Sequence, residues 1–276
     1  MIVQFTERKN QIILMLILAI YFLWLAVPIA FNGSESIRVV AVFDDDEALL
    51  FGWIKQAIKQ KTLFIPFWNY GHLYFNLGIF PLFIIDQFMP VTDQVIIVFY
   101  RLLSAGFFAG TIWVIYLILE KLTGKNIALI IAVTSMLSSL MIIDYSIMIH
   151  PDTTQLFFVL LGFLFLVHYQ ENKKFRFLLL SSVVAGLAFS TKYAGVFLLP
   201  VLVFAFLRNA TGKSIKEQIL KLIVIILSFF FAFAITSPAL IYDFNFIEGL
   251  YSVKNSIEEG HIVKNGESAL EWLYLL

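Results

Sequence analysis

The sequence contains no cysteine, and only 14% of its 276 residues are charged. The missing cysteine excludes a disulfide framework, a thiolate metal site and a cysteine nucleophile. An ordinary soluble domain is about 25% charged and about 45–50% apolar, whereas this chain is 61% hydrophobic with a mean hydropathy of +0.90. A soluble protein of this length cannot bury so much apolar surface in one core. Lipid is therefore the expected solvent for most of the chain, which excludes a soluble enzyme, a nucleic-acid-binding protein and a disordered scaffold.

An excess of charge of either sign is also lacking, because 19 Lys and Arg residues balance 19 Asp and Glu residues. The sequence has no P-loop, no dinucleotide-binding glycine pattern, no HExxH motif and no GxSxG motif. No repeat of fixed period stands out, which weakens the case for an inverted-repeat transporter. The polar residues near the ends of apolar runs are therefore the candidates for chemistry.

Long apolar runs predict an all-α polytopic membrane protein, a single transmembrane domain over residues 1–276. Crossing a ~30 Å hydrocarbon core takes about 20 residues of helix. The first run follows Arg8 and Lys9 as a signal peptide would, but no small-x-small cleavage site follows it, which favours a retained helix. About seven transmembrane helices are predicted, at about 11–31, 93–119, 125–143, 150–169, 177–190, 194–207 and 219–241.

The short runs 177–190 and 194–207 could form a hairpin or one long span. The distribution of charge favours the hairpin, because it places the cation-rich segments on the cytoplasmic side and leaves the excess of acids on the other side. The predicted topology has a cytoplasmic N-terminus, an outer loop at 32–92 and an outer tail at 242–276. The cation-rich segments are 1–10, 120–125, 171–176 and 208–221.

The outer loop has helical patterning of its own. From Glu47 to Lys61, apolar residues recur at helical spacing opposite Lys and Gln side chains, which is typical of an amphipathic helix in the membrane interface. The apolar segment 67–88 is interrupted by glycine, proline and Asp86, and we interpret it as interfacial or re-entrant structure.

Asp44, Asp45, Asp46 and Glu47 form the densest polar feature of the chain, just beyond the first span. One interpretation is a helix cap, because Asp44 and Glu47 have capping-box spacing and acids suit a helix N-terminus. Capping needs only one or two carboxylates, however, and adjacent carboxylates repel one another. The cluster at a membrane interface therefore favours a bound cation, or a base whose pKa is tuned by its neighbours.

Two basic residues lie where a charge is costly. Arg101 is predicted inside the second span, where it could snorkel to the surface or clamp a phosphate with its guanidinium fork. Lys192, in the Thr191-Lys192-Tyr193 turn of the short hairpin, is expected below the interface. It needs an anion there, which could be the acidic loop or a phosphate. Function is the favoured interpretation for both residues.

Two histidines extend this polar group. His72 could equally be a packed, hydrogen-bonded side chain or a functional one. His150-Pro151-Asp152 opens the fourth span, with Asp144 just before it, although proline and an acid are also ordinary at a helix start. Together, the polar residues of the outer half of the membrane suit a reaction between a lipid-borne phosphate and an extracytoplasmic acceptor.

Several motifs, in this order, resemble the membrane glycosyltransferases of family 39, the protein mannosyltransferase and aminoarabinose transferase group with the C-type (GT-C) fold. The resemblance covers nearly the whole chain. Members of that family usually continue through further spans after the point where this chain ends, so it is interpreted as their N-terminal transmembrane module. The matching stretches are Asp46-Glu47, HLYFNL at 72–77, RLLSA at 101–105, HPD at 150–152, GLAFSTKYAGVFLLP at 186–200 and SPALIYDFNF at 237–246.

The resemblance implies a polyprenyl-phosphate-linked sugar as donor, attacked by an acceptor hydroxyl at the outer membrane face. It implies that Asp46 takes the acceptor proton and that Glu47 and Asp45 orient Asp46. It also implies that Asp46 and Glu47 could hold a divalent cation. Arg101 and Lys192 would then stabilise the charge that builds on the leaving phosphate. The remaining residues expected to bind substrate are Tyr193, His150, Asp152 and His72.

The expected location is the plasma (inner) membrane, with the active site extracytoplasmic. The expected partners are the lipid-linked sugar donor, a protein or glycolipid acceptor and membrane lipids, with no nucleic acid. A membrane transporter or lipid flippase is the rival class, but its charges would line a path across the membrane, whereas these cluster toward one face. A structural subunit would leave the acidic cluster with no role beyond capping.

Overall fold

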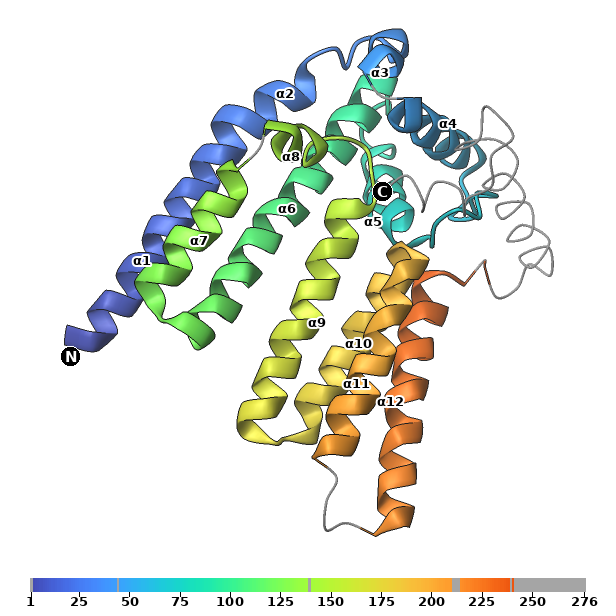
Figure 1. Cartoon of the computed structure of the whole chain (residues 1–276). Coiled ribbons are helices and arrows are strands. Elements are labelled where there is room, and N and C mark those ends of the chain that lie inside the picture. The colour runs from blue at the N-terminus through green and yellow to red at the C-terminus, as the bar shows by residue number, and fades with distance from the viewer. Residues whose placement is uncertain (1, 44, 139, 210–213, 239, 241–276) are drawn as a thin grey trace, which may run out of the picture.

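The computed structural model describes residues 2–43, 45–138, 140–209, 214–238 and 240. Within these ranges the chain is helical and contains no strand, which confirms the predicted all-α class. Figure 1 shows two groups of long helices side by side, with shorter helices gathered at one end. Asp44 and the predicted outer tail 242–276 lie outside the described residues, and the side chain of Asp45 is also not described.

The first group of helices is built from the N-terminal half of the chain. α1, a π-helical turn and α2 form one rod, which packs against α6 and α7 around the buried side chains of Tyr21, Phe108 and Tyr116. Gly124 has a φ of +90°, a conformation that favours glycine, and it lets the chain reverse between α6 and α7. The bounds are α1 Ile2–Ile20, the π-helical turn Tyr21–Ala26, α2 Val27–Phe31, α6 Asp93–Thr123 and α7 Lys125–Leu137.

The second group contains α9 to α12, and α9 also packs against α6 and so joins the two groups. Its core includes Leu178, Leu202 and Phe229, all buried. Gly186 allows a close approach, because a Cβ there would lie 2.2 Å from the carbonyl oxygen of Phe229. The bounds are α9 Asp152–Asn172, α10 Phe175–Thr191, a 3₁₀ turn Tyr193–Phe197, α11 Leu198–Arg208 and α12 Ile215–Thr236.

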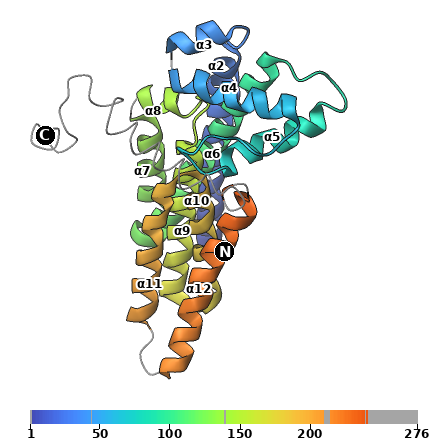
Figure 2. The same cartoon turned by 90° about the vertical axis from the view of Figure 1, so that its right-hand side faces the viewer.

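The shorter helices form a cap over one end of the bundle (Figure 2). The predicted amphipathic helix exists as α4, and its apolar side packs against protein, because Leu50, Ile54 and Ala57 are buried in the cluster that holds the aromatic side chains of α5 and α6. This packing fixes the start of α4, which contains Asp45, Asp46 and Glu47 of the acidic cluster. The bounds are α3 Ile37–Phe43, α4 Asp45–Gln60, α5 Leu73–Ile85 and α8 Leu140–Tyr145.

The surface of the long helices is apolar. Trp24, Phe204 and Phe231 are 79%, 67% and 66% exposed, as expected for side chains that face lipid. Four helical stretches are long and apolar enough to cross a membrane: Lys9–Phe31, Asp93–Thr123, Asp152–Asn172 and Ile215–Thr236. The other apolar helices are shorter, and the predicted span 125–143 is divided between α7 and α8. The chain is a polytopic membrane protein, and the division into seven spans stays a prediction.

Candidate active site

Glu47 and Arg101 form a buried, two-pronged ion pair at the capped end of the bundle. The Nε of Arg101 donates to Oε1 of Glu47 at 2.7 Å, and Nη2 donates to Oε2 at 2.9 Å. Glu47 is 1% exposed and Arg101 is 7% exposed. A parallel pair of charge-assisted hydrogen bonds of this kind fixes both side chains in one geometry. The pair ties the first turn of α4 to α6.

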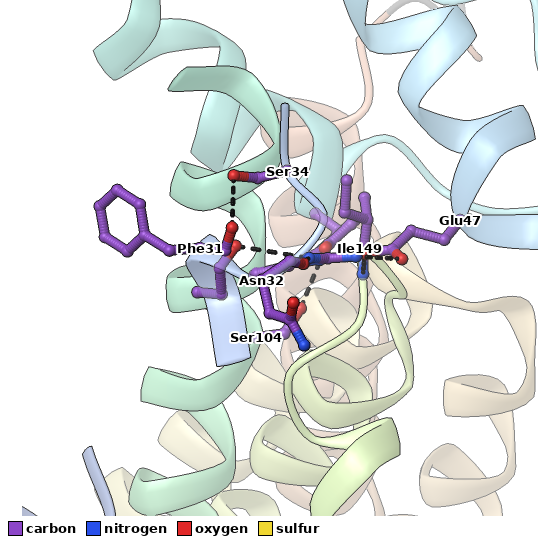
Figure 3. Close-up of polar contacts among 9 residues, drawn as sticks. Phe31, Asn32, Ser34, Glu47, Ser104 and Ile149 are labelled. Carbon is purple, nitrogen blue, oxygen red and sulfur yellow. Dashed lines mark hydrogen bonds and ion pairs between the residues drawn. The ribbon is translucent and has the colours of Figure 1, made fainter. Parts of the chain in front are cut away.

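Backbone groups satisfy the remaining polar atoms of this pair. The Nη1 of Arg101 donates to the carbonyl oxygens of Asn32 at 2.8 Å and Ala30 at 3.4 Å. The Oε1 of Glu47 also accepts from the backbone N–H of Ile149 at 3.1 Å (Figure 3). The end of α2, the start of α4, α6 and the segment before α9 therefore meet at a single ion pair. All three guanidinium nitrogens of Arg101 already donate to protein oxygens, which differs from the free phosphate clamp expected from the sequence.

A pocket of about 420 Å³ opens beside the ion pair, and Glu47 and Arg101 line part of it. Its polar lining is completed by Asn32 and Asp144, both exposed. The apolar lining comes from Ile29, Ile147 and Met148. This volume falls within the ~300–1,000 Å³ typical of small-ligand sites.

A second polar cluster joins α9 to the turn between α10 and α11. The Nζ of Lys192 forms an ion pair with Oδ1 of Asp152, and Nδ1 of His150 lies 2.8 Å from Oδ2 of the same carboxylate. The Lys192 side chain is 23% exposed, and that of Asp152 is 47% exposed. The Nε2 of Gln155 also donates to the backbone carbonyl oxygen of Lys192 at 3.1 Å, which fixes the turn. Three residues predicted to bind substrate therefore lie together.

Two tyrosines surround this second cluster. The Lys192 Nζ lies 4.8 Å from the ring centroid of Tyr70, within the range of a cation–π contact. The Tyr70 hydroxyl is 3.4 Å from Nε2 of His150. Tyr193 donates its hydroxyl to the carbonyl oxygen of Tyr70 at 3.1 Å and so fixes the 62–72 loop against the α10–α11 turn. Tyr193 therefore anchors the turn that carries Lys192, and its role in binding substrate stays a prediction.

The two clusters share one short segment of chain. The backbone N–H of Ile149 binds Glu47, and the next residue, His150, contacts Asp152 and Tyr70. Both clusters thus lie at the capped end of the bundle, on either side of the segment 146–152.

His72 lies apart from both clusters. Its side chain is fully buried, with the rings of Phe64 and Trp68 packed against it, and neither ring nitrogen has a hydrogen-bond partner among the described residues. Burial lowers the pKa of His72 from 6.5 to about 4, against the opposing influence of the carbonyl groups of Phe67 and Ile65. The imidazole is therefore neutral at pH 7. In this structure it packs the 62–72 loop, which is one of the two roles that the sequence left open, and its expected role in substrate binding stays a prediction.

The acidic cluster divides into residues of different exposure. Asp46 is exposed in the first turn of α4, next to buried Glu47. Among the described residues there is no group of three or more His, Cys, Asp or Glu side chains that could hold a metal ion. Both Glu47 oxygens already accept hydrogen bonds from Arg101, and Oε1 also accepts one from Ile149. The predicted divalent-cation site at Asp46 and Glu47 therefore stays a prediction, and no step below is assigned to a metal ion.

Some site residues were not predicted from the sequence. Asn32, Met148 and Tyr70 carried no motif signal of their own, and Asp144 was noted only as a neighbour of the HPD motif. Pairing of Glu47 with Arg101, 54 positions apart, was also not predicted. The one available signal was that a buried cation and a buried acid in the same half of the membrane need partners.

The helices and the two polar clusters describe a polytopic membrane protein with a charged site at one end of its bundle. Residues 78–242 match the family model of dolichyl-phosphate-mannose-protein mannosyltransferases, and since this match covers more than half of the chain, the chain belongs to that family. It is a membrane-bound glycosyltransferase of the GT-C type. No curated protein and no solved structure matches it.

Proposed function

We propose that this chain carries the site at which a sugar moves from a polyprenyl-phosphate-linked donor to an acceptor hydroxyl at the extracytoplasmic face of the plasma membrane. The observation that carries the proposal is the juxtaposition of the two clusters at one end of the bundle. The cluster around Lys192 holds a cation that can bind a phosphate. The cluster around Glu47 and Arg101 holds carboxylates beside a pocket. A transporter would instead be expected to have its charges along a path through the midplane.

The distribution of basic residues supports this orientation. At the opposite end of the bundle, Lys121 of α6 pairs with Glu171 of α9 at 2.7 Å, and Lys173 and Arg208 lie on the same end of neighbouring helices. Segments that flank spans and carry an excess of Lys and Arg face the cytoplasm. The capped end, with both polar clusters, would then face outward.

Lys192 is assigned to the donor phosphate. Its ammonium group is only partly exposed and contacts the carboxylate of Asp152 and the ring of Tyr70. The donor phosphodiester has two non-bridging oxygens that share one negative charge, and either oxygen can replace or extend the contact of Lys192 with Asp152. His150 and Asp152 would orient Lys192, and Tyr193 would keep the turn in place.

Asp46 is assigned as the base, and Glu47 as the residue that positions it. The Glu47–Arg101 pair fixes the first turn of α4, and exposed Asp46 directly precedes Glu47, which lines the pocket. In the transfer step, Asp46 accepts the hydroxyl proton, the acceptor oxygen bonds to the anomeric carbon, and the bond from that carbon to the phosphate oxygen breaks. The polyprenyl phosphate leaves with the electron pair, and Lys192 offsets its charge.

Sugar transfer by the protein in lipid vesicles, with decaprenyl-phosphate mannose as donor, tests this assignment. Asp46→Asn should reduce transfer by about 10²–10⁴-fold, the usual contribution of a general base. Asp86→Asn, which alters an exposed acid at the end of α5, serves as the control and should retain activity. Equal activity of the two variants would contradict the role of Asp46.

A further inference from the structure

The pocket beside the ion pair has a net negative charge once its internal pairing is counted. Arg101 neutralises Glu47, so neither presents a net charge to a ligand. Asp144 remains, with an exposed carboxylate that has no side-chain hydrogen bond or ion pair among the described residues. The ligand-facing polar groups are therefore one carboxylate and the amide of Asn32, beside the apolar side chains of Ile147 and Met148.

This lining selects against a phosphate and in favour of hydrogen-bond donors. A phosphate would meet the carboxylate of Asp144 at close range, while Arg101, the cation among the described lining residues, already donates from all three of its guanidinium nitrogens to protein oxygens. Hydroxyl and ammonium groups, in contrast, can donate to Asp144 and to the carbonyl oxygen of the Asn32 side chain. The pocket is thus chemically distinct from the cluster around Lys192.

We propose that this pocket binds the acceptor, and that Asp144 selects a polypeptide segment in which the acceptor hydroxyl lies next to a Lys or Arg residue. The proposal rests on the transferase function proposed above and names its acceptor class. A neighbouring cationic side chain would pair with Asp144, while its aliphatic stem packs against the partly exposed side chains of Ile29 and Met148. The hydroxyl is then left near Glu47, one residue from Asp46.

A polypeptide fits this lining better than an anionic glycolipid does. Two of the lining residues are exposed, Asn32 just after α2 and Asp144 of α8, so an extended chain that passes over them could place one or two side chains in the pocket. A volume of about 420 Å³ is sufficient for two side chains of moderate size. The anionic phosphates of a glycolipid core would face Asp144 without a compensating cation.

The test uses the wild-type protein in vesicles with decaprenyl-phosphate mannose and three alanine-rich peptides. Each peptide has a single Thr, followed by Lys, Ala or Glu. We expect the KM of the Lys peptide to be about fivefold below that of the Ala peptide, the upper end for a partly exposed ion pair, and the Glu peptide to be the poorest. Asp144→Asn should remove this order by raising the KM of the Lys peptide, with kcat changed less than about twofold. Asp144→Lys should reverse the order.

A binding measurement separates failure of this proposal from failure of the transferase function. A benzophenone-bearing Lys peptide, irradiated with the protein, should crosslink at Met148, which lines the pocket and is partly exposed. Asp144→Asn should weaken that crosslink, whereas Asp86→Asn should not. Crosslinking there without sugar transfer from any donor would overturn the transferase function and support the pocket as a peptide site. Equal KM values for the three peptides, or crosslinks elsewhere, would overturn the acceptor proposal. Transfer to an amino-sugar glycolipid but to none of the peptides would overturn its polypeptide class.

Discussion

Removal of one partner of the Glu47–Arg101 pair should destabilise the capped end of the bundle. Glu47→Gln leaves a guanidinium group that is 7% exposed without its counter-ion, and Arg101→Met leaves a carboxylate that is 1% exposed with only the N–H of Ile149. Arg101→Met also removes the hydrogen bonds to Asn32 and Ala30. Breaking a buried ion pair by removing one partner costs about 3–5 kcal/mol of unfolding free energy.

The assay is thermal unfolding in mild detergent, followed by tryptophan fluorescence. Each single variant should melt roughly 10 °C below the wild type, if about 1 kcal/mol corresponds to a few degrees at this size. The Glu47→Leu/Arg101→Leu double variant should recover much of that loss, because no buried charge is left unpaired. Lys55→Gln is the matched control, because it breaks the ion pair of Lys55 with Asp93, whose side chains are 34% and 45% exposed. Loss of such an exposed pair should lower the unfolding free energy by less than about 1 kcal/mol. If the single variants have the same melting temperature as Lys55→Gln, the reasoning is refuted.

Three other substitutions or conditions test the packing around the site. The pKa of His72 is about 4 in the folded protein against 6.5 for an ordinary His, so the unfolded chain binds a proton first as the pH falls. The unfolding free energy should therefore be highest above about pH 6.5 and should decrease by about 3 kcal/mol as the pH falls to 4. His72→Phe should remove this part of the pH dependence of the melting temperature. Gly71→Ala should lower the melting temperature by several degrees, because its Cβ would lie 2.1 Å from the carbonyl oxygen of Ser190, and an unchanged value would show that the loop can move away. Tyr100→Phe should cost about 1–3 kcal/mol in the same unfolding assay, because it removes a buried 2.6 Å hydrogen bond to the carbonyl oxygen of Phe75; a loss no larger than that of Lys55→Gln would contradict it.

The sequence predicted the helices well because apolar length and periodicity determine them locally. The last three residues of the acidic cluster, Asp45 to Glu47, do lie at the start of a helix, and the short hairpin does turn at Lys192. The environment of α4 was harder to predict, because the apolar face of an amphipathic helix can pack against either lipid or protein. Both environments favour the same apolar side chains. Burial of Leu50 and Ile54 against α5 and α6 depends on contacts far apart in the chain.

The pairing of charges was the least predictable part of the site. Sequence reasoning could place Arg101 and Lys192 where they need anions, but not assign Glu47 to one and Asp152 to the other. These choices depend on how α4, α6 and α9 meet, which no local pattern encodes. Burial of His72 also depends on the path of the 62–72 loop, because an isolated His among aromatic residues has the same sequence pattern in a core and in a binding site.

Native mass spectrometry of the protein purified in mild detergent tests the central claim most directly. If the Lys192 cluster binds the donor, a polyprenyl phosphate or its sugar conjugate should co-purify with the wild type and with the Lys55→Ala control. That lipid should be lost from Lys192→Ala, and its mass would identify the sugar. Absence of any such lipid from the folded wild type, or equal retention by Lys192→Ala, would contradict the account.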